Sequence, residues 1–169
     1  MAAVILTACS SSTAATQSPS PTAPGKGCVS TAQARQVWTQ IDKQLNAIEL
    51  DPKHAGVANV ATGQARLLIN QYLQQQLVAN NFTEREVDRL DALVVEVAGC
   101  GGRELQVRVT ETVVTDDYLN PAGKVDHRDP AVGTTIHIRE TLVRSGASWK
   151  ESNFIDLDQP QPTQSPVVV

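Results

Sequence analysis

The chain has few aromatic residues, no excess of positive charge and no long apolar run. Aromatic residues make up 4% of its 169 residues, and 14 Lys and Arg residues against 18 Asp and Glu residues give a net charge of −4. Proteins that bind nucleic acids usually carry a basic stripe, so this balance predicts no nucleic-acid partner. A membrane-spanning helix needs roughly 20 consecutive apolar residues, and no such run is present.

The sequence also lacks the short motifs of several enzyme classes. It contains no GxSxG turn, no HExxH helix and no phosphate-binding loop. The absence of a CxxC pair removes support for thioredoxin-like redox chemistry and for cysteine-based zinc sites. We therefore assign no catalytic residue and expect no cofactor. The three histidines, His54, His127 and His137, are far apart in the sequence, and we expect them on the surface.

The apolar N-terminus ends in Leu6-Thr7-Ala8-Cys9 and precedes a run rich in Ser, Thr, Ala and Pro. These four residues resemble the lipobox of bacterial lipoproteins, in which cleavage precedes a cysteine whose thiol carries a diacylglyceryl group. The resemblance implies that residues 1–9 are a truncated lipoprotein signal with a start further upstream. It also implies that acylated Cys9 anchors an extracytoplasmic protein to the lipid bilayer of a bacterial cell membrane. The alternative is that residues 2–8 are merely an apolar terminus.

Composition divides the rest of the chain into three parts. Residues 10–27 and 159–169 bury too little apolar surface to offset their ordering entropy, so we expect a disordered tether and a disordered tail. The part between them, residues 28–158, is long enough for one globular domain. With Cys9 acylated, Cys28 and Cys100 remain, and this pair predicts a disulfide in an oxidising compartment. The alternative is two unrelated thiols.

Helical spacing dominates the first half of this domain. Ser30 and Gln33 form a predicted capping box, followed by an apolar stripe that predicts a helix ending at Asp51-Pro52. A second helical segment, residues 52–80, is weakened in its first half by two glycines. Thr83 with Glu86 predicts another capping box and a short helix to about Leu90. The two apolar stripes are Ala34, Val37, Trp38, Ile41, Leu45 and Ile48, and then Ala65, Leu68, Ile69, Tyr72, Leu73 and Leu77.

The second half of the domain alternates with a period of two, which predicts strands. The pattern indicates a hairpin around residues 93–97 and 105–110, a long loop over 116–133, and two further strands at 134–143 and 149–157. Helices followed by an antiparallel meander predict an α+β fold, with N-terminal helices packed on a curved sheet of about four strands.

This order of elements resembles the nuclear transport factor 2-like superfamily, and in particular small actinobacterial lipoproteins of that kind. Residues 143–151, Val143-Arg144-Ser145-Gly146-Ala147-Ser148-Trp149-Lys150-Glu151, are similar to the family's final hairpin. Residues 119–125, which contain Gly123-Lys124, resemble the preceding hairpin loop. The resemblance implies a cone-like domain with a pocket. Family enzymes use Asp, His or Tyr inside the cone, but none of those positions can be matched here.

One loop is rich in oxygen ligands. Asp116, Asp117, Asp126, His127 and Asp129 crowd the stretch that is predicted to be a loop. Such a loop can hold Ca²⁺, but the spacing is not that of an EF-hand and a charged hairpin tip is usually just solvated. We therefore predict no metal site.

Alternation also places polar groups on the apolar face of three strands. Counting by twos from apolar residues puts Glu111, Glu140 and Glu151 on that face, together with Asn153. Buried carboxylates are costly unless they are paired or protonated, and a polar-lined pocket would explain them. The alternative, which we favour at this point, is a β-bulge that shifts the register and turns these carboxylates outward.

Three functions are consistent with the sequence. The first is a non-enzymatic, membrane-anchored lipoprotein that binds a small ligand or an envelope protein. The second is a hydrolase-, isomerase- or cyclase-like enzyme that uses the carboxylates of a cone pocket as acid or base. The third is a structural subunit that forms a homodimer through the outer face of the sheet. The missing motifs and the tether favour the first.

Overall fold

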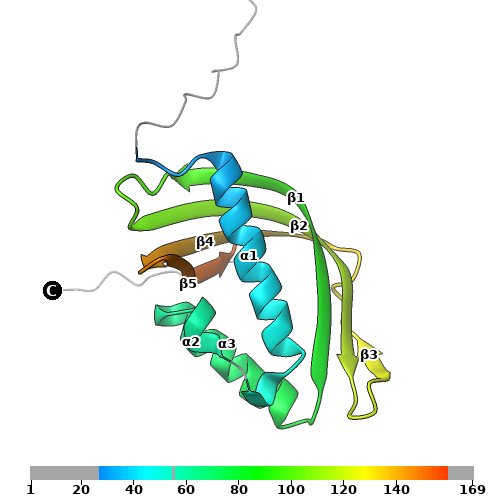
Figure 1. Cartoon of the computed structure of the whole chain (residues 1–169). Coiled ribbons are helices and arrows are strands. Elements are labelled where there is room, and N and C mark those ends of the chain that lie inside the picture. Colours follow the sequence, from blue (N-terminus) through cyan, green and yellow to red (C-terminus); the bar gives the residue numbers. More distant parts are fainter. Residues whose placement is uncertain (1–26, 55, 160–169) are drawn as a thin grey trace, which may run out of the picture.

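The computed structural model describes residues 27–54 and 56–159. The lipobox with Cys9, most of the predicted tether and most of the predicted tail lie outside these residues. Within them, helices come first and an antiparallel sheet follows, as the sequence predicts (Figure 1). None of the helices in the described part is long and apolar enough to cross a membrane.

Helix α1, Thr31–Glu49, begins at the predicted capping box. The Ser30 hydroxyl accepts a hydrogen bond from the Gln33 backbone N–H, and the Gln33 side chain accepts one from the Ser30 backbone N–H. Both bonds satisfy N–H groups that the first helical turn leaves unpaired. Four residues of the predicted stripe are buried: Ala34, Trp38, Ile41 and Ile48.

The second helical segment is broken where the sequence predicts weakness. It consists of η1 (Pro52–His54), α2 (Val57–Val60), α3 (Gly63–Tyr72) and the π-helical η2 (Leu73–Val78). Gly63 opens α3 with a φ of +54°, a conformation that favours glycine. The buried side of this segment includes Leu73 and Leu77, which are almost fully inaccessible to solvent.

A five-stranded antiparallel sheet follows. Its strands are β1 (Thr83–Val97), β2 (Glu104–Leu119), β3 (Val125–Arg128), β4 (Thr135–Ser145) and β5 (Ser148–Asp156). The order is β1-β2-β4-β5, and the short β3 pairs with the end of β2. The sheet curves around the helices, so that α1 and α3 lie on its concave side (Figure 1).

Two predictions about this region are wrong. Residues 83–90 form the first half of β1 instead of a short helix, because they pair with β2 from Thr83↔Leu119 onward. The predicted loop over 116–133 is also too long. β2 continues to Leu119, and β3 pairs back onto it through Asp117↔Arg128. Pairing with a neighbouring strand overrides the weak helical signal of one capping box.

The core consists of two apolar clusters on the concave side. The first packs the N-terminal part of α1 against the sheet: Ala34, Trp38, Ile41, Leu93, Leu105, Val107, Val109 and Leu142. The second packs the end of α1 against α2, α3 and η2: Ile48, Val57, Val60, Ala61, Ala65, Leu73 and Leu77. Leu45 of α1 packs against both clusters.

Cys28 and Cys100 form a disulfide with a Sγ–Sγ distance of 1.96 Å. The bond joins the chain just before α1 to the turn between β1 and β2. A backbone hydrogen bond of 2.7 Å from Val29 N–H to the Ala98 carbonyl supports the same junction. Disulfides persist in oxidising compartments, so this pair fits an extracytoplasmic protein.

Candidate functional site

A cavity of about 610 Å³ lies between the concave face of the sheet and the helices. Ligand pockets typically measure roughly 300–1,000 Å³, so this space is large enough for a small organic molecule. Its apolar and aromatic lining comes from both core clusters and the adjoining strands: Trp38, Ile41, Leu45, Leu68, Ile69, Tyr72, Tyr118, Ile136, Ile138 and Phe154.

The polar lining of this cavity is acidic on every side. Its uncharged polar groups are the side chain of Asn46, the indole N–H of Trp38 and two tyrosine hydroxyls, and no Lys, Arg or His of the described part lines it. The acidic residues come from α1, from β1, β2, β4 and β5, and from the segment that precedes β4. They are Asp42, Glu49, Glu84, Glu86, Asp88, Glu111, Asp116, Asp129, Glu140 and Glu151.

The structure places Glu111, Glu140 and Glu151 together in this lining. Their exposed fractions are only 5%, 8% and 5%. The sheet register explains this placement, because Glu111 follows Val109 on the concave face of β2, and Glu140 on β4 lies opposite buried Val107. The alternative, in which a bulge turns these carboxylates to the outside, is wrong.

A bulge does occur in β5, but it comes after Glu151. Glu151 pairs with Leu142, and the next pair is Asn153↔Thr141, so Ser152 is the extra residue. The extra residue puts Asn153 opposite an outward-facing position and brings Phe154 to the cavity. The prediction that Asn153 shares the face of Glu151 is therefore wrong.

These three carboxylates differ in their partners. The indole N–H of Trp38 donates a 2.7 Å hydrogen bond to Glu140 Oε1. Glu111 and Glu151 make no side-chain hydrogen bond to any residue that the structure describes. Arg108 and Arg139 pair with Glu96 on the other face of the sheet, and Lys150, which precedes Glu151, donates a hydrogen bond to the Ala58 carbonyl. The buried carboxylates therefore have no cationic partner in the described part of the chain.

Burial sets the protonation of these groups. Burial, followed by the charges of Asp88 and Glu140, raises the pKa of Glu111 to about 8. Burial is also the main cause that raises the pKa of both Glu140 and Glu151, and the charge of Glu151 adds to the effect on Glu140. A carboxyl with a pKa near 8 is mostly protonated at neutral pH.

A second acidic group lies around Tyr72. Its hydroxyl donates a 2.5 Å hydrogen bond to Glu84 Oε2 and lies 2.9 Å from the Tyr118 hydroxyl. Glu84 is 3% exposed, and burial raises its pKa above the usual range. Asp116 is 8% exposed, and its Oδ1 atom has no hydrogen-bond partner among the described residues. This group extends the acidic lining toward the far end of α1, where burial raises the pKa of Glu49 to about 8.

Sequence reasoning missed Glu84, Glu86 and Asp88, because it assigned their segment to a helix. A signal was present: these acidic residues alternate with Arg85, Val87 and Arg89 along the chain. The alternation has a period of two and places the acidic residues on the concave face. The apolar pattern that usually reveals strands is absent here because the inward residues are charged.

The residues considered for Ca²⁺ do not form one site. Asp116 faces the cavity, whereas Asp117 is 1% exposed and is held by ion pairs with Arg85 and Arg128. Asp126 pairs with His127 at the exposed strand β3. No group of three or more potential ligands that could hold a metal ion occurs among residues 27–54 and 56–159.

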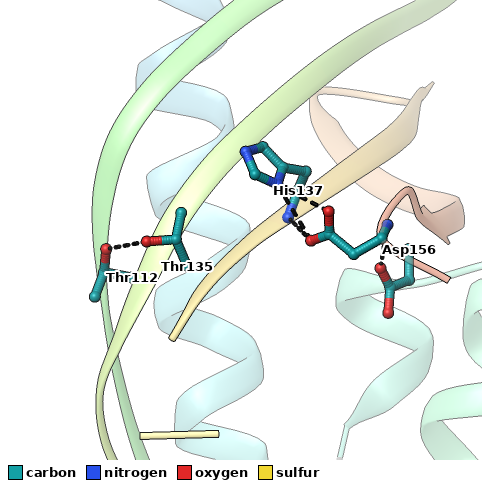
Figure 2. A network of polar contacts seen from close by, with 5 residues as sticks. Thr112, Thr135, His137 and Asp156 are labelled. Atoms are coloured by element: carbon teal, nitrogen blue, oxygen red, sulfur yellow. Dashed lines mark hydrogen bonds and ion pairs between the residues drawn. The ribbon is translucent and has the colours of Figure 1, made fainter. Parts of the chain in front are cut away.

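The three histidines lie on exposed surfaces. His54 pairs with Asp51, and His127 stacks on Tyr118 with ring centroids 4.4 Å apart. Figure 2 shows His137 on β4, near the Thr112–Thr135 contact of 3.2 Å between β2 and β4. Its Nδ1 lies 3.0 Å from a carboxylate oxygen of Asp158. None of the three lines the cavity.

No protein-family model matches the chain. No curated protein matches its sequence either. Among solved structures, Aln2 from a Streptomyces species has a TM-score of 0.51 at 15% identity, over 76% of this chain and 92% of that one. The intermembrane space region of the chloroplast protein ARC6 has a TM-score of 0.48 at 12% identity, over 72% of this chain and 94% of that one. At 15% identity the likeness concerns the fold alone: the chain shares an α+β fold with a Streptomyces protein.

Proposed function

We propose that this protein is an extracytoplasmic lipoprotein whose folded domain binds a small organic ligand in the cavity. The observation that carries the proposal is the cavity of about 610 Å³, which combines apolar walls with buried Glu111 and Glu151, whose side chains have no hydrogen-bond partner among the described residues. Cavities with mostly apolar walls and a few convergent polar groups are typical ligand sites. We also propose membership of the nuclear transport factor 2-like superfamily, because helices cover the concave face of a curved antiparallel sheet here.

The test of ligand binding is a thermal-shift screen of small molecules with two matched variants. Ile138→Phe places a larger side chain on β4 inside the cavity, and Val143→Phe makes the same change on the outer face of the same strand. A ligand at about 100 times its Kd should stabilise the wild type by about 2.7 kcal/mol. We expect Val143→Phe to keep this shift and Ile138→Phe to lose it. A ligand that stabilises both variants equally would place binding outside the cavity.

Lipid anchoring through Cys9 has its own test. Two acyl chains bind a bilayer stably, since each buried CH₂ contributes roughly 0.8 kcal/mol. We therefore expect mass spectrometry of the native protein to show a lipid-modified Cys9, and we expect Cys9→Ser to move the protein from the membrane fraction to the soluble fraction. Ser10→Ala is the control and should stay in the membrane fraction. An unmodified Cys9 that still follows an intact Ala8 would contradict the proposal.

An acid–base enzyme is the second candidate function. The observation that favours it is the raised pKa of Glu111 beside Glu140, because a carboxylic acid that stays protonated near neutral pH can act as a general acid. The test is the recovery of a bound ligand after prolonged incubation. Conversion of the ligand by the wild type, abolished by Glu111→Gln, would favour the enzyme. Recovery of unchanged ligand would favour the binding function.

Dimerisation through the outer face of the sheet has less support. Exposed Val94 and Val97 lie on that side, but the ion pairs of Glu96 with Arg108 and Arg139 interrupt any apolar patch between them. Interfaces of stable dimers are more apolar than this.

A further inference from the structure

The charge of the cavity lining is unbalanced. Buried carboxylates cost free energy unless they are protonated or paired with a cation. Ten acidic residues line the cavity, and the described part of the chain contributes no Lys, Arg or His to its wall. Arg85, Arg108, Arg128 and Arg139 all pair with carboxylates that do not line the cavity. The compensating positive charge must therefore come from protons or from a bound molecule.

Several buried carboxylate oxygens in the cavity lining have no hydrogen-bond partner among the described residues. Glu111 and Glu151 are 95% buried, both line the cavity, and neither makes a side-chain hydrogen bond to a described residue. Asp116, which is 92% buried, contributes the unpartnered Oδ1 at the other acidic group. Buried polar groups in folded proteins are nearly always hydrogen-bonded. Three such groups facing one cavity indicate acceptors for hydrogen-bond donors that residues 27–54 and 56–159 do not supply.

We propose that the ligand of this cavity is an organic amine or ammonium cation with an apolar body. The proposal rests on the proposed function, namely that the cavity binds a ligand at all. An ammonium group donates up to three hydrogen bonds and accepts none, which matches a wall of carboxylates. Charge-assisted bonds between an ammonium and a carboxylate are about twice as strong as neutral ones.

The aromatic walls explain the apolar body. The chain has only two Trp, two Tyr and two Phe residues. Four of these six line the cavity: Trp38, Tyr72, Tyr118 and Phe154. Aromatic faces attract ammonium groups by about 0.5–2 kcal/mol each, and they also bury apolar carbon. An aliphatic or aryl amine fits this combination better than a sugar or an anion does.

A metal ion fits the lining less well than an organic cation. A metal needs several ligands at about 2.0–2.6 Å around one point. The acidic residues here are spread along the cavity, and no group of three or more of them, within the residues that the structure describes, could hold a metal ion. A molecule with some length can contact acidic groups at both ends of the cavity.

Binding of a cation must displace protons. Glu111 is surrounded by acidic groups from each element packed against it: Asp42 of α1, Asp88 of β1, Glu140 of β4 and Glu151 of β5. Burial and the neighbouring charges raise the pKa of Glu111 to about 8, so this carboxyl is mostly protonated at pH 7. An ammonium favours the ionised carboxylate and lowers these pKa values, whereas an uncharged ligand leaves the protons in place.

The experiment uses three probes that share a phenylalkyl body and differ in their polar end group: 4-phenylbutylamine, 4-phenylbutanol and 4-phenylbutyrate. Binding to the full chain at pH 7 is followed by Trp38 fluorescence in a Trp149→Phe background, since Trp149 does not line the cavity. We expect the amine to bind at least about tenfold more tightly than the alcohol, and the butyrate not to bind. Calorimetry in two buffers with different ionisation enthalpies should show proton release for the amine only.

Two variants test whether the cavity carboxylates recognise the ammonium group, and a third, on the outer face of the sheet, is the control. Glu111→Gln and Glu151→Gln should each weaken amine binding about tenfold while leaving alcohol binding unchanged. Gln replaces a protonated carboxyl with little change in shape, so both variants should fold. Glu104→Gln removes the same charge from the outer, exposed face of β2 and should bind the amine as the wild type does.

Each contrary result has a distinct meaning. If the alcohol or the butyrate binds in the cavity at least as tightly as the amine, the cation class is wrong while ligand binding survives. If Glu104→Gln weakens amine binding as much as Glu111→Gln does, the cavity carboxylates are not the recognition element and the proposal fails. If none of the three probes binds, the proposal also fails. In that case the thermal-shift screen decides whether the cavity binds any ligand.

Discussion

Replacing Cys28 and Cys100 with alanine is expected to lower the free energy of unfolding by about 4 kcal/mol. The bond closes a loop with a sequence separation of 72 residues, and a cross-link of that span removes much of the conformational freedom of the unfolded chain. The loss is large because a domain of this size has a total stability of only about 5–15 kcal/mol. Urea unfolding of the wild type and of the double variant, both in a Cys9→Ser background, measures this loss of unfolding free energy.

The matched control for this prediction is reduction of the disulfide without mutation. Dithiothreitol should destabilise the wild type by the same amount and leave the double variant unchanged. Identical urea midpoints for the oxidised and reduced wild type would show that the cross-link contributes nothing. A large loss would also mean that the domain requires an oxidising compartment for its full stability.

The protein should be several kcal/mol more stable near pH 5 than near pH 9. Burial raises the pKa of Glu111 and of Glu49 from 4.5 to about 8 in the folded state. Between these two values the folded state holds protons that the unfolded chain releases, so stability falls as pH rises from about 4.5 and the loss is complete above about 8. Each pKa unit corresponds to about 1.4 kcal/mol. Urea unfolding at pH steps from 5 to 9 measures the slope.

Two variants test whether cavity carboxyls cause this dependence of the unfolding free energy on pH. Glu111→Gln removes a titrating carboxyl and should flatten the profile, whereas Glu104→Gln on the exposed face should leave it unchanged. Below about pH 4 the sign reverses, because ion pairs lower the pKa of Asp117 and of Glu96. A profile that rises steadily from pH 5 to pH 9 would contradict burial of protonated carboxyls.

Local patterns were enough to predict α1 and the last two strands. The Ser30 capping box and the stripe through Trp38 and Ile41 agree with each other, so the helix begins and ends where both signals indicate. In β4, Ile136 and Ile138 mark the concave face and thereby place Glu140 on it. Counting from these apolar neighbours gave the inward orientation of Glu140, although the bulge that would turn it outward was the favoured alternative.

The same reasoning failed where inward residues are themselves charged. Glu84, Glu86 and Asp88 have apolar neighbours at a spacing of two only at the ends of the run, Phe82 and Leu90, so the apolar signal for their face of β1 is weak. Their burial depends on pairing with β2 and on the helices that close the cavity, which are contacts between distant parts of the chain. The favoured bulge, which would turn Glu111, Glu140 and Glu151 outward, was wrong for a related reason. A preference for exposed carboxylates holds on average, and a cavity with unpaired acidic groups is an exception to it.

The position of the disulfide also determines how the domain responds to mechanical tension. Cys28 precedes α1, and Cys100 lies between β1 and β2. A pull on the chain before Cys28 crosses the covalent bond to Cys100 and continues through β2 toward the C-terminus. The helices and β1 lie within the segment that this covalent path bypasses. If the domain hangs from a membrane by its N-terminus, tension along the chain cannot straighten the backbone between the two cysteines, which includes α1 and the helical side of the cavity, while the disulfide is intact.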